Sequence, residues 1–200
     1  KLQNKLKVNT AIDSEKIIIL DFGSQYTQLI ARRIRELGVY SEILSYGTSY
    51  ENILKANPKG IIISGGPESV NAKNTLKVDS KILESEIPVL GVCYGMQLMT
   101  KHFRGSVNTS KKREFGHAEI KLNKSKLFQD IKISTLNVWM SHGDKVTKLP
   151  KGFKKVASSK NSPIAAFENN SIKKYGLQFH PEVTHTEKGA QILKTFVREI

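Results

Sequence analysis

The single cysteine of the sequence, Cys93, lies in the short segment Gly91-Val-Cys-Tyr-Gly95. An apolar run, 89–92, precedes it, and apolar residues at roughly helical spacing follow it as far as Phe103. A strand that enters a helix through Gly-x-Cys-x-Gly is the cysteine version of the nucleophile elbow, in which glycines permit a tight turn. The turn would place the sulfur at a helix N-terminus, where partial positive charge favours a thiolate. The pattern therefore predicts a nucleophilic cysteine.

A nucleophilic cysteine needs a base, and the base needs a group that orients it. Among the five histidines, His180 is the best candidate because it follows the apolar run 175–179, at the expected end of a strand. Glu182 lies two residues further on, so its carboxylate can hold one imidazole nitrogen while the other faces Cys93. A lone histidine at a strand end is often structural, and spacing alone leaves both roles open.

An acyl-transfer site also needs hydrogen-bond donors for the oxyanion. The backbone N–H of Tyr94 directly follows the nucleophile. A second donor is expected from Ser64-Gly-Gly-Pro67, at the end of the apolar run 61–63, because glycines let the backbone approach a substrate closely. The alternative is an ordinary Gly-Gly turn.

The first half of the chain alternates short apolar runs with amphipathic segments. This pattern predicts strands over 16–20, 39–44, 61–63 and 89–92, and helices over 25–37, 50–56, 76–86 and 96–103. The alternation indicates a doubly wound α/β fold: an open, mostly parallel sheet with helices on both faces. Sites in such folds lie at the carboxyl ends of the strands.

The second half changes character and suggests a smaller, partly antiparallel portion. Short strands separated by polar turns are expected over 118–122, 135–139, 154–158, 164–167 and 175–179, followed by a C-terminal helix over 189–200. We expect one domain over 16–200, preceded by a flexible polar leader over 1–15.

The net charge of +14 arises from 32 basic and 18 acidic residues. The lysines are scattered with little aromatic interleaving, so we expect a solvated basic surface rather than nucleic-acid binding. No apolar run approaches the ~20 residues of a membrane span, so no membrane association is expected. A lone cysteine fits a reducing compartment, and we expect a cytoplasmic protein.

Three ordered segments resemble the signatures of class I (triad-type) glutamine amidotransferase domains: Gly91-Val-Cys-Tyr-Gly-Met-Gln97, Ser64-Gly-Gly-Pro67 and Phe179-His-Pro-Glu182. Four more resemble the amidotransferase domain of GMP synthetases rather than those of anthranilate, carbamoyl phosphate or CTP synthases. These are Asp21-Phe-Gly-Ser-Gln-Tyr26, Arg113-Glu-Phe-Gly116, Trp139-Met-Ser-His-Gly-Asp-Lys-Val146 and His180-Pro-Glu-Val-Thr-His185. The resemblance covers residues 16–200 and implies a flavodoxin-like fold.

The resemblance implies hydrolysis of L-glutamine to glutamate and ammonia. Cys93 would attack the side-chain amide and form a glutamyl thioester. His180 would protonate the departing ammonia and then activate water, and Glu182 would hold His180. The backbone N–H groups of Gly66 and Tyr94 would stabilise the oxyanion.

The resemblance also assigns a pocket for glutamine. Gln97, one helical turn past Cys93, would face the head group of the substrate. Backbone groups of Ser141, Gly143 and Asp144 would complete the pocket. The resemblance implies that this half-reaction needs no metal and no organic cofactor.

In GMP synthetases a second domain, an ATP pyrophosphatase that needs ATP and Mg²⁺, uses the ammonia to aminate XMP. Its phosphate-binding loop is absent from this sequence, so the partner would be that domain or subunit. We expect an excised domain rather than a separate subunit, and the full-length enzyme is a possible homodimer. The alternatives are a non-catalytic docking module on the same fold, or another cysteine hydrolase such as a γ-glutamyl hydrolase.

For several other polar residues the sequence leaves two roles open. His142 is expected either to orient glutamine or contact the synthetase, or to be a structural turn residue bonded to backbone. Arg113 and Glu114 lie in a charged run that is usually a solvated face, although the matching stretch in the family suggests an interdomain role. Trp139 is expected in the core. His185 and Glu187 are expected at the surface or capping a helix, and His102 and His117 remain unassigned.

Overall fold

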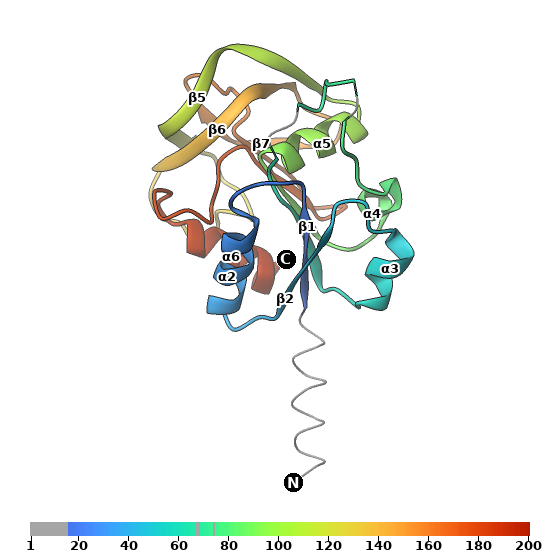
Figure 1. Ribbon diagram of the computed structural model, residues 1–200. Coiled ribbons are helices and arrows are strands. Elements are labelled where there is room, and N and C mark those ends of the chain that lie inside the picture. Colours follow the sequence, from blue (N-terminus) through green and yellow to red (C-terminus); the bar gives the residue numbers. More distant parts are fainter. Residues whose placement is uncertain (1–15, 67–68, 74) are drawn as a thin grey trace.

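The computed structural model describes residues 16–66, 69–73 and 75–200 (Figure 1). The predicted leader over 1–15 lies outside these residues. The described chain forms one nine-stranded sheet in the order β2-β1-β3-β4-β9-β8-β7-β5-β6. The strands are β1 (Ile17–Asp21), β2 (Ser41–Ser45), β3 (Gly60–Ile63), β4 (Val89–Val92), β5 (Ser106–Leu122), β6 (Thr135–Lys148), β7 (Lys154–Ser159), β8 (Ala166–Asn169) and β9 (Lys174–Leu177).

The sheet has a parallel and an antiparallel part. The strands β2, β1, β3, β4 and β9 are parallel to one another, whereas β8, β7, β5 and β6 continue the sheet with antiparallel pairing. The predicted α/β fold with a partly antiparallel C-terminal portion is therefore confirmed. The last strand along the chain, β9, returns to pair with β4, so the polypeptide that follows it arrives beside the end of β4.

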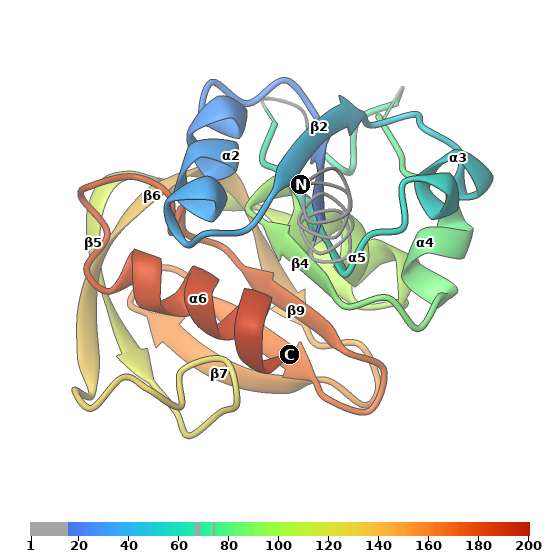
Figure 2. The ribbon, with the colours of Figure 1, turned by 90° about the horizontal axis from the view of Figure 1, so that it is seen from below.

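Helices cover both faces of the parallel part (Figures 1 and 2). The helices α2 (Thr27–Glu36) and α6 (Gly189–Glu199) lie side by side on one face, and α3 (Tyr50–Lys55), α4 (Ser80–Glu84) and α5 (Tyr94–His102) lie on the other. Residues of β1 alternate between two hydrophobic cores, with Ile17 and Ile19 against α2 and α6, and Ile18 and Leu20 against the opposite helices. Both faces of β1 are therefore buried, as is typical of a strand in a parallel sheet, and this explains why its apolar run is unbroken.

The hairpin of β5 and β6 is longer than predicted: β5 begins at Ser106 rather than 118, and β6 continues to Lys148 rather than ending at 139. Figure 1 shows the hairpin arching over the carboxyl ends of the parallel strands. Backbone pairing across the hairpin, rather than an apolar side-chain pattern, defines these strands, and a register shift lies between Thr109 and Glu114. A strand at the edge of a sheet tolerates charged residues, which hid both extensions from hydrophobic patterning.

The helix expected over 76–86 is also shorter, because α4 begins only at Ser80. The carboxylate of Asp79 accepts a hydrogen bond from the backbone N–H of Lys81 and so defines the start of the helix. The preceding Leu76 and Val78 pack on the core without being helical. Among the described residues, no helix is both long and apolar enough to cross a bilayer.

Candidate active site

The turn between β4 and α5 has the geometry of a nucleophile elbow. Cys93 occupies the position before the first residue of α5, with φ 55° and ψ −106°. A positive φ is strained for a residue with a side chain. Added Cβ atoms show why glycines flank it: one on Gly91 would lie 2.6 Å from the carbonyl carbon of Gly95, and one on Gly95 would collide with the carbonyl oxygen of Ile63. The backbone here leaves no room for side chains.

The two strands beside β4 bring further groups to Cys93. The segment after β3 places Gly65 so close that an added Cβ would lie 3.4 Å from the Cβ of Cys93 and 3.2 Å from Cε1 of His180. The segment after β9 carries His180, which is 3% exposed. The sheet order β3-β4-β9 therefore assembles three segments from distant parts of the sequence at one edge.

His180 is held on several sides. Its Nδ1 lies 2.7 Å from Oε1 of Glu182, and its backbone N–H donates to the carbonyl of Trp139 on β6. The hydroxyl of Thr186 donates to the carbonyl of His180, and the ring of Tyr26 contacts the imidazole edge-on. These contacts leave Nε2 as the nitrogen available to the sulfur.

The charge balance of His180 follows from its neighbours. Burial disfavours the imidazolium, but the hydrogen bonds and negative charge of Cys93 and Glu182 outweigh burial and raise the pKa of His180 to about 10. The ring therefore carries a proton between a carboxylate and the sulfur at neutral pH. The second carboxylate oxygen of Glu182 is buried without a hydrogen-bond partner among the described residues.

A pocket of about 550 Å³ opens beside Cys93. Its walls come from the β1–α2 turn, the segments after β3 and β4, and the β5–β6 hairpin. The lining residues are Gly23, Ser24, Gln25, Tyr26, Gly66, Ser69, Cys93, Tyr94, Gln97, Arg113, Phe115, Ser141, His142, Gly143, Asp144 and His180. Residues from several elements thus line one pocket that includes Cys93.

The predicted pocket residues on β6 are tied to Cys93 and α5. The carbonyl of Ser141 lies 3.5 Å from Sγ of Cys93. The carbonyl of Asp144 accepts a hydrogen bond of 3.0 Å from Nε2 of Gln97, and its carboxylate accepts one from the hydroxyl of Ser69. The segment 141–144 therefore forms one wall of the pocket.

The family model described as "Glutamine amidotransferase class-I" matches residues 18–200 of this chain. The chain belongs to the class-I glutamine amidotransferases. It is 52% identical over 187 residues to the GMP synthase (glutamine-hydrolyzing) of Vibrio vulnificus, an alignment that covers 93% of this chain and 36% of that protein. It is 50% identical over 194 residues to the GMP synthase of Aliivibrio fischeri, covering 96% of this chain and 37% of the relative.

A solved structure shows the same fold. A putative GMP synthase subunit from Thermoplasma acidophilum superposes with a TM-score of 0.80 at 30% identity, covering 91% of this chain and 92% of that one. This chain spans little more than a third of the length of the two bacterial GMP synthases. The predicted family and its flavodoxin-like α/β fold are therefore confirmed.

Every residue that the sequence suggested for the amidotransferase site, apart from Glu182, lines the pocket, and Glu182 lies behind His180. The four candidates for glutamine binding, Gln97, Ser141, Gly143 and Asp144, lie together. Pro67, in the predicted oxyanion segment, lies outside the described residues. Among the described residues, no group of three or more His, Cys, Asp or Glu side chains is arranged to hold a metal ion.

Sequence reasoning missed Gln178 beside Cys93 and Arg33 beside Glu182. Nε2 of Gln178 lies 3.7 Å from the sulfur, while Oε1 of Gln178 accepts from Gln97. Gln178 precedes His180 by two positions, and alternation along an extended segment would have placed both on one face. Arg33 on α2 donates to the carbonyl of Glu182, and its place on a polar helix face gave no signal.

Three interpretations were wrong or incomplete. Glu114 is 8% exposed, so it does not lie on a solvated face. His142 is buried within β6 rather than in a turn, although it does contact backbone, at the carbonyl of Asp144. Trp139 is only partly buried and packs against the rings of His117 and the exposed His185.

Glu187 is exposed, as predicted, and accepts a hydrogen bond from the backbone of Asn137 on β6. With Thr186, which accepts a hydrogen bond from the backbone N–H of Trp139, it ties the segment after His180 to the hairpin. The surface residue thus has a positioning contact.

Proposed function

We propose that this chain hydrolyses L-glutamine through Cys93, His180 and Glu182, and that the ammonia serves the amination of XMP to GMP. The observation that carries the proposal is the imidazolium of His180, held between the Glu182 carboxylate and the sulfur at a helix N-terminus. A cysteine paired in this way is available as the thiolate nucleophile. The relatives named as glutamine-hydrolysing GMP synthases support the substrate and the product.

The geometry suggests the following steps. The thiolate of Cys93 attacks the carboxamide carbon of glutamine, and the oxyanion forms near the backbone N–H groups of Gly66 and Tyr94. His180 then gives its proton to the departing nitrogen, which leaves as ammonia while a glutamyl thioester forms. The neutral His180 takes a proton from water, which attacks the thioester and releases glutamate. The sum is glutamine plus water to glutamate plus ammonia.

The substrate would lie in the pocket of about 550 Å³ with its amide at Cys93. Gln97 and the backbone of Ser141, Gly143 and Asp144 would bind it. The half-reaction needs no cofactor from this domain, because a thiolate, a proton donor and hydrogen-bond donors complete it.

The partner would be an ATP pyrophosphatase domain or subunit that uses ATP and Mg²⁺, and the complete enzyme would be a cytoplasmic homodimer. The length of the relatives supports a partner, since this chain matches about a third of each. The ammonia released beside Cys93 would then pass to that partner.

The test is glutamate release by the chain with a competent synthetase, ATP and XMP, in wild type and in Cys93→Ala. We expect wild type to release glutamate and Cys93→Ala to release none above background. Equal inactivity of the two, with GMP formation from added ammonia proving that the synthetase is competent, would refute the proposal. A pH–rate profile would report apparent values of the Cys–His pair rather than of either residue.

A further inference from the structure

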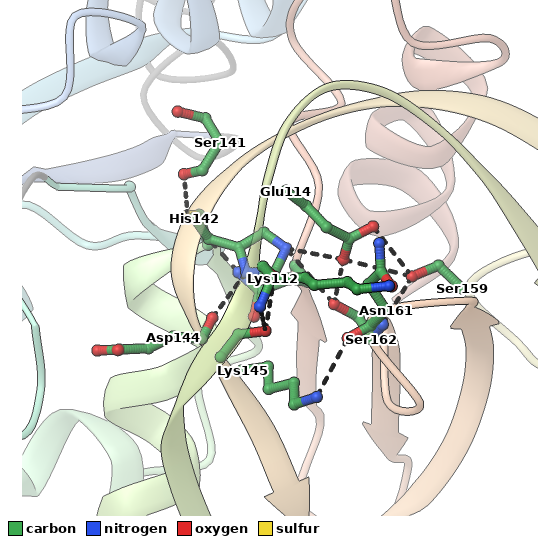
Figure 3. A network of polar contacts seen from close by, with 12 residues as sticks. Lys112, Glu114, Ser141, His142, Asp144, Lys145, Ser159, Asn161 and Ser162 are labelled. Carbon is green, nitrogen blue, oxygen red and sulfur yellow. Dashed lines mark hydrogen bonds and ion pairs between the residues drawn. The ribbon is translucent and has the colours of Figure 1, made fainter.

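A second buried histidine–glutamate pair lies beside the pocket, between the two strands of the hairpin (Figure 3). Nε2 of His142 on β6 lies 3.2 Å from Oε1 of Glu114 on β5, and both side chains are less than one-tenth exposed. The hydroxyls of Ser159 and Ser162, from β7 and the turn that follows it, both donate to the carboxylate of Glu114. The Glu114 carboxylate therefore has His142, Ser159 and Ser162 as side-chain partners.

The network favours an ionised Glu114. Burial raises the pKa of this carboxyl, but the hydrogen bonds of His142, Ser162 and Ser159 and the charge of His142 outweigh burial and lower it. An ionised carboxylate only accepts hydrogen bonds. The nitrogen of His142 that faces Glu114 is therefore a donor.

The other nitrogen of His142 faces a second acceptor. Nδ1 lies 2.6 Å from the backbone carbonyl of Asp144. Since a carbonyl oxygen can only accept, Nδ1 also donates. The two ring nitrogens of His142 thus lie against two acceptors, the Glu114 carboxylate and the Asp144 carbonyl. The pair therefore presents a fixed N–H to the backbone of the pocket wall.

The carbonyl of Asp144 links this pair to the reactive centre. It also accepts from Nε2 of Gln97, which in turn donates to Oε1 of Gln178. The amide nitrogen of Gln178 lies 3.7 Å from the sulfur of Cys93. An unbroken chain of polar contacts thus leads from Glu114 to Cys93.

We propose that His142 and Glu114 are positioning residues that hold the segment 141–144 in the shape that binds glutamine. The inference rests on the proposed hydrolysis of glutamine, which it extends to two residues outside the reacting groups. His142 acts through the Asp144 carbonyl and Gln97, and Glu114 acts by keeping the His142 ring oriented. Neither residue transfers a proton in the reaction.

A merely structural role would have a different signature. Replacing a buried ion pair with apolar residues of similar volume is often neutral for stability, whereas removing one partner is costly. Thermal stability alone therefore does not separate the two roles. Three measurements separate a positioning role from a merely structural one. They are KM for glutamine, backbone hydrogen exchange of the segment 141–144, and rescue by a side chain that restores one N–H.

The test compares His142→Phe with His142→Asn, using the whole chain with a competent synthetase, ATP and XMP. Phenylalanine keeps the ring but removes both N–H groups, whereas the amide nitrogen of asparagine takes the place of Nδ1 and can donate to Asp144. We expect His142→Phe to raise KM about tenfold, as for loss of one hydrogen bond to the pocket wall, with kcat within about threefold. His142→Asn should return KM to within about threefold of wild type.

Hydrogen exchange of the backbone over 141–146 is the second readout and needs no turnover. Exchange over 141–146 should be faster in His142→Phe than in wild type and should return to the wild-type rate in His142→Asn. Exchange over 94–102 should be the same in all three proteins. If His142→Phe fails to fold because Glu114 is left unpaired, the double variant Glu114→Met with His142→Phe removes that charge and takes its place.

Unchanged KM and exchange in His142→Phe would overturn the inference, as would a failure of asparagine to restore either. A wild-type chain that hydrolyses no glutamine would refute the proposed function instead. The exchange result would then still decide whether His142 holds the pocket wall.

Discussion

The two buried histidine–glutamate pairs of this domain have similar chemistry but opposite connectivity. His180 has one nitrogen on Glu182 and the other toward Cys93, and one oxygen of Glu182 has no partner among the described residues. In the second pair, both nitrogens of His142 face acceptors, and serine hydroxyls bind Glu114. The first pair keeps a nitrogen for chemistry, and the second uses every nitrogen for structure.

The difference teaches where reactivity arises in this fold. Both histidines are buried, so burial does not separate them. Position does, because His180 follows a central parallel strand beside the elbow, whereas His142 lies inside a strand at the edge of the sheet. A histidine whose hydrogen bonds are all taken by protein has no free nitrogen for a substrate.

The largest effect is expected from replacing the histidine of the first pair, His180. His180→Asn removes the nitrogen that faces Cys93, and glutamine turnover should fall about a thousandfold, as for loss of a general acid and base. Glutamate release with a competent synthetase measures it. His102→Asn, at the far end of α5, is the matched control and should keep wild-type turnover. More than a tenth of wild-type turnover in His180→Asn would contradict the role of His180.

The next prediction compares the same substitution at the two glutamates. Glu182→Gln should lower kcat about a hundredfold because His180 loses its orienting charge. Glu114→Gln should leave kcat within about threefold, because the second pair does not meet the reacting atoms. Steady-state kinetics of both variants give the answer. Equal losses of kcat would erase the distinction between the pairs.

The pH dependence should sharpen the same comparison. Glu182→Gln removes a partner that raises the pKa of His180, so the pKa should fall from about 10 toward its ordinary value of about 6.5. Because the folded value is the higher one, the pair stabilises the fold fully below about pH 6.5 and loses this effect as the pH rises through about 10. Histidine NMR titration measures the shift, and an unchanged titration would contradict the assignment.

A smaller effect should follow from a substitution in the turn that positions Cys93, with both histidines left intact. Gly95→Ala would press a methyl group onto the carbonyl of Ile63 and should destabilise the fold by about 1–3 kcal/mol. Gly47→Ala is the control, since an added Cβ meets nothing within 4 Å there. Denaturant unfolding compares the two. Equal stabilities would show that the elbow tolerates a side chain.

Much of the parallel part followed from sequence, because buried strands such as β1 are apolar runs and the elbow glycines mark a turn. His180 and Glu182 were found for the same reason, since a strand end is visible in the pattern. The order β3-β4-β9 was not visible, because it depends on the chain returning from the antiparallel part to pair with β4. The contact of His180 with Cys93 therefore needed the structure.

The hairpin shows what hydrophobic patterning cannot reach. Its strands carry charged residues at the sheet edge, so the burial of Glu114 and His142 was hidden in a polar run. Hydrogen bonds from Ser159 and Ser162 make that burial possible, and these serines lie more than forty residues from Glu114 in the sequence. Side-chain networks between distant segments have no periodic signature.

The most direct test of the account is covalent labelling of the whole chain by a glutamine-mimicking electrophile, followed by intact mass and peptide mapping. We expect a single adduct on Cys93, slowed by added glutamine, abolished in Cys93→Ala and strongly slowed in His180→Asn. In His142→Asn, labelling at saturating reagent should reach completion at close to the wild-type rate. No adduct on Cys93, or His180→Asn labelling as fast as wild type, would contradict the account.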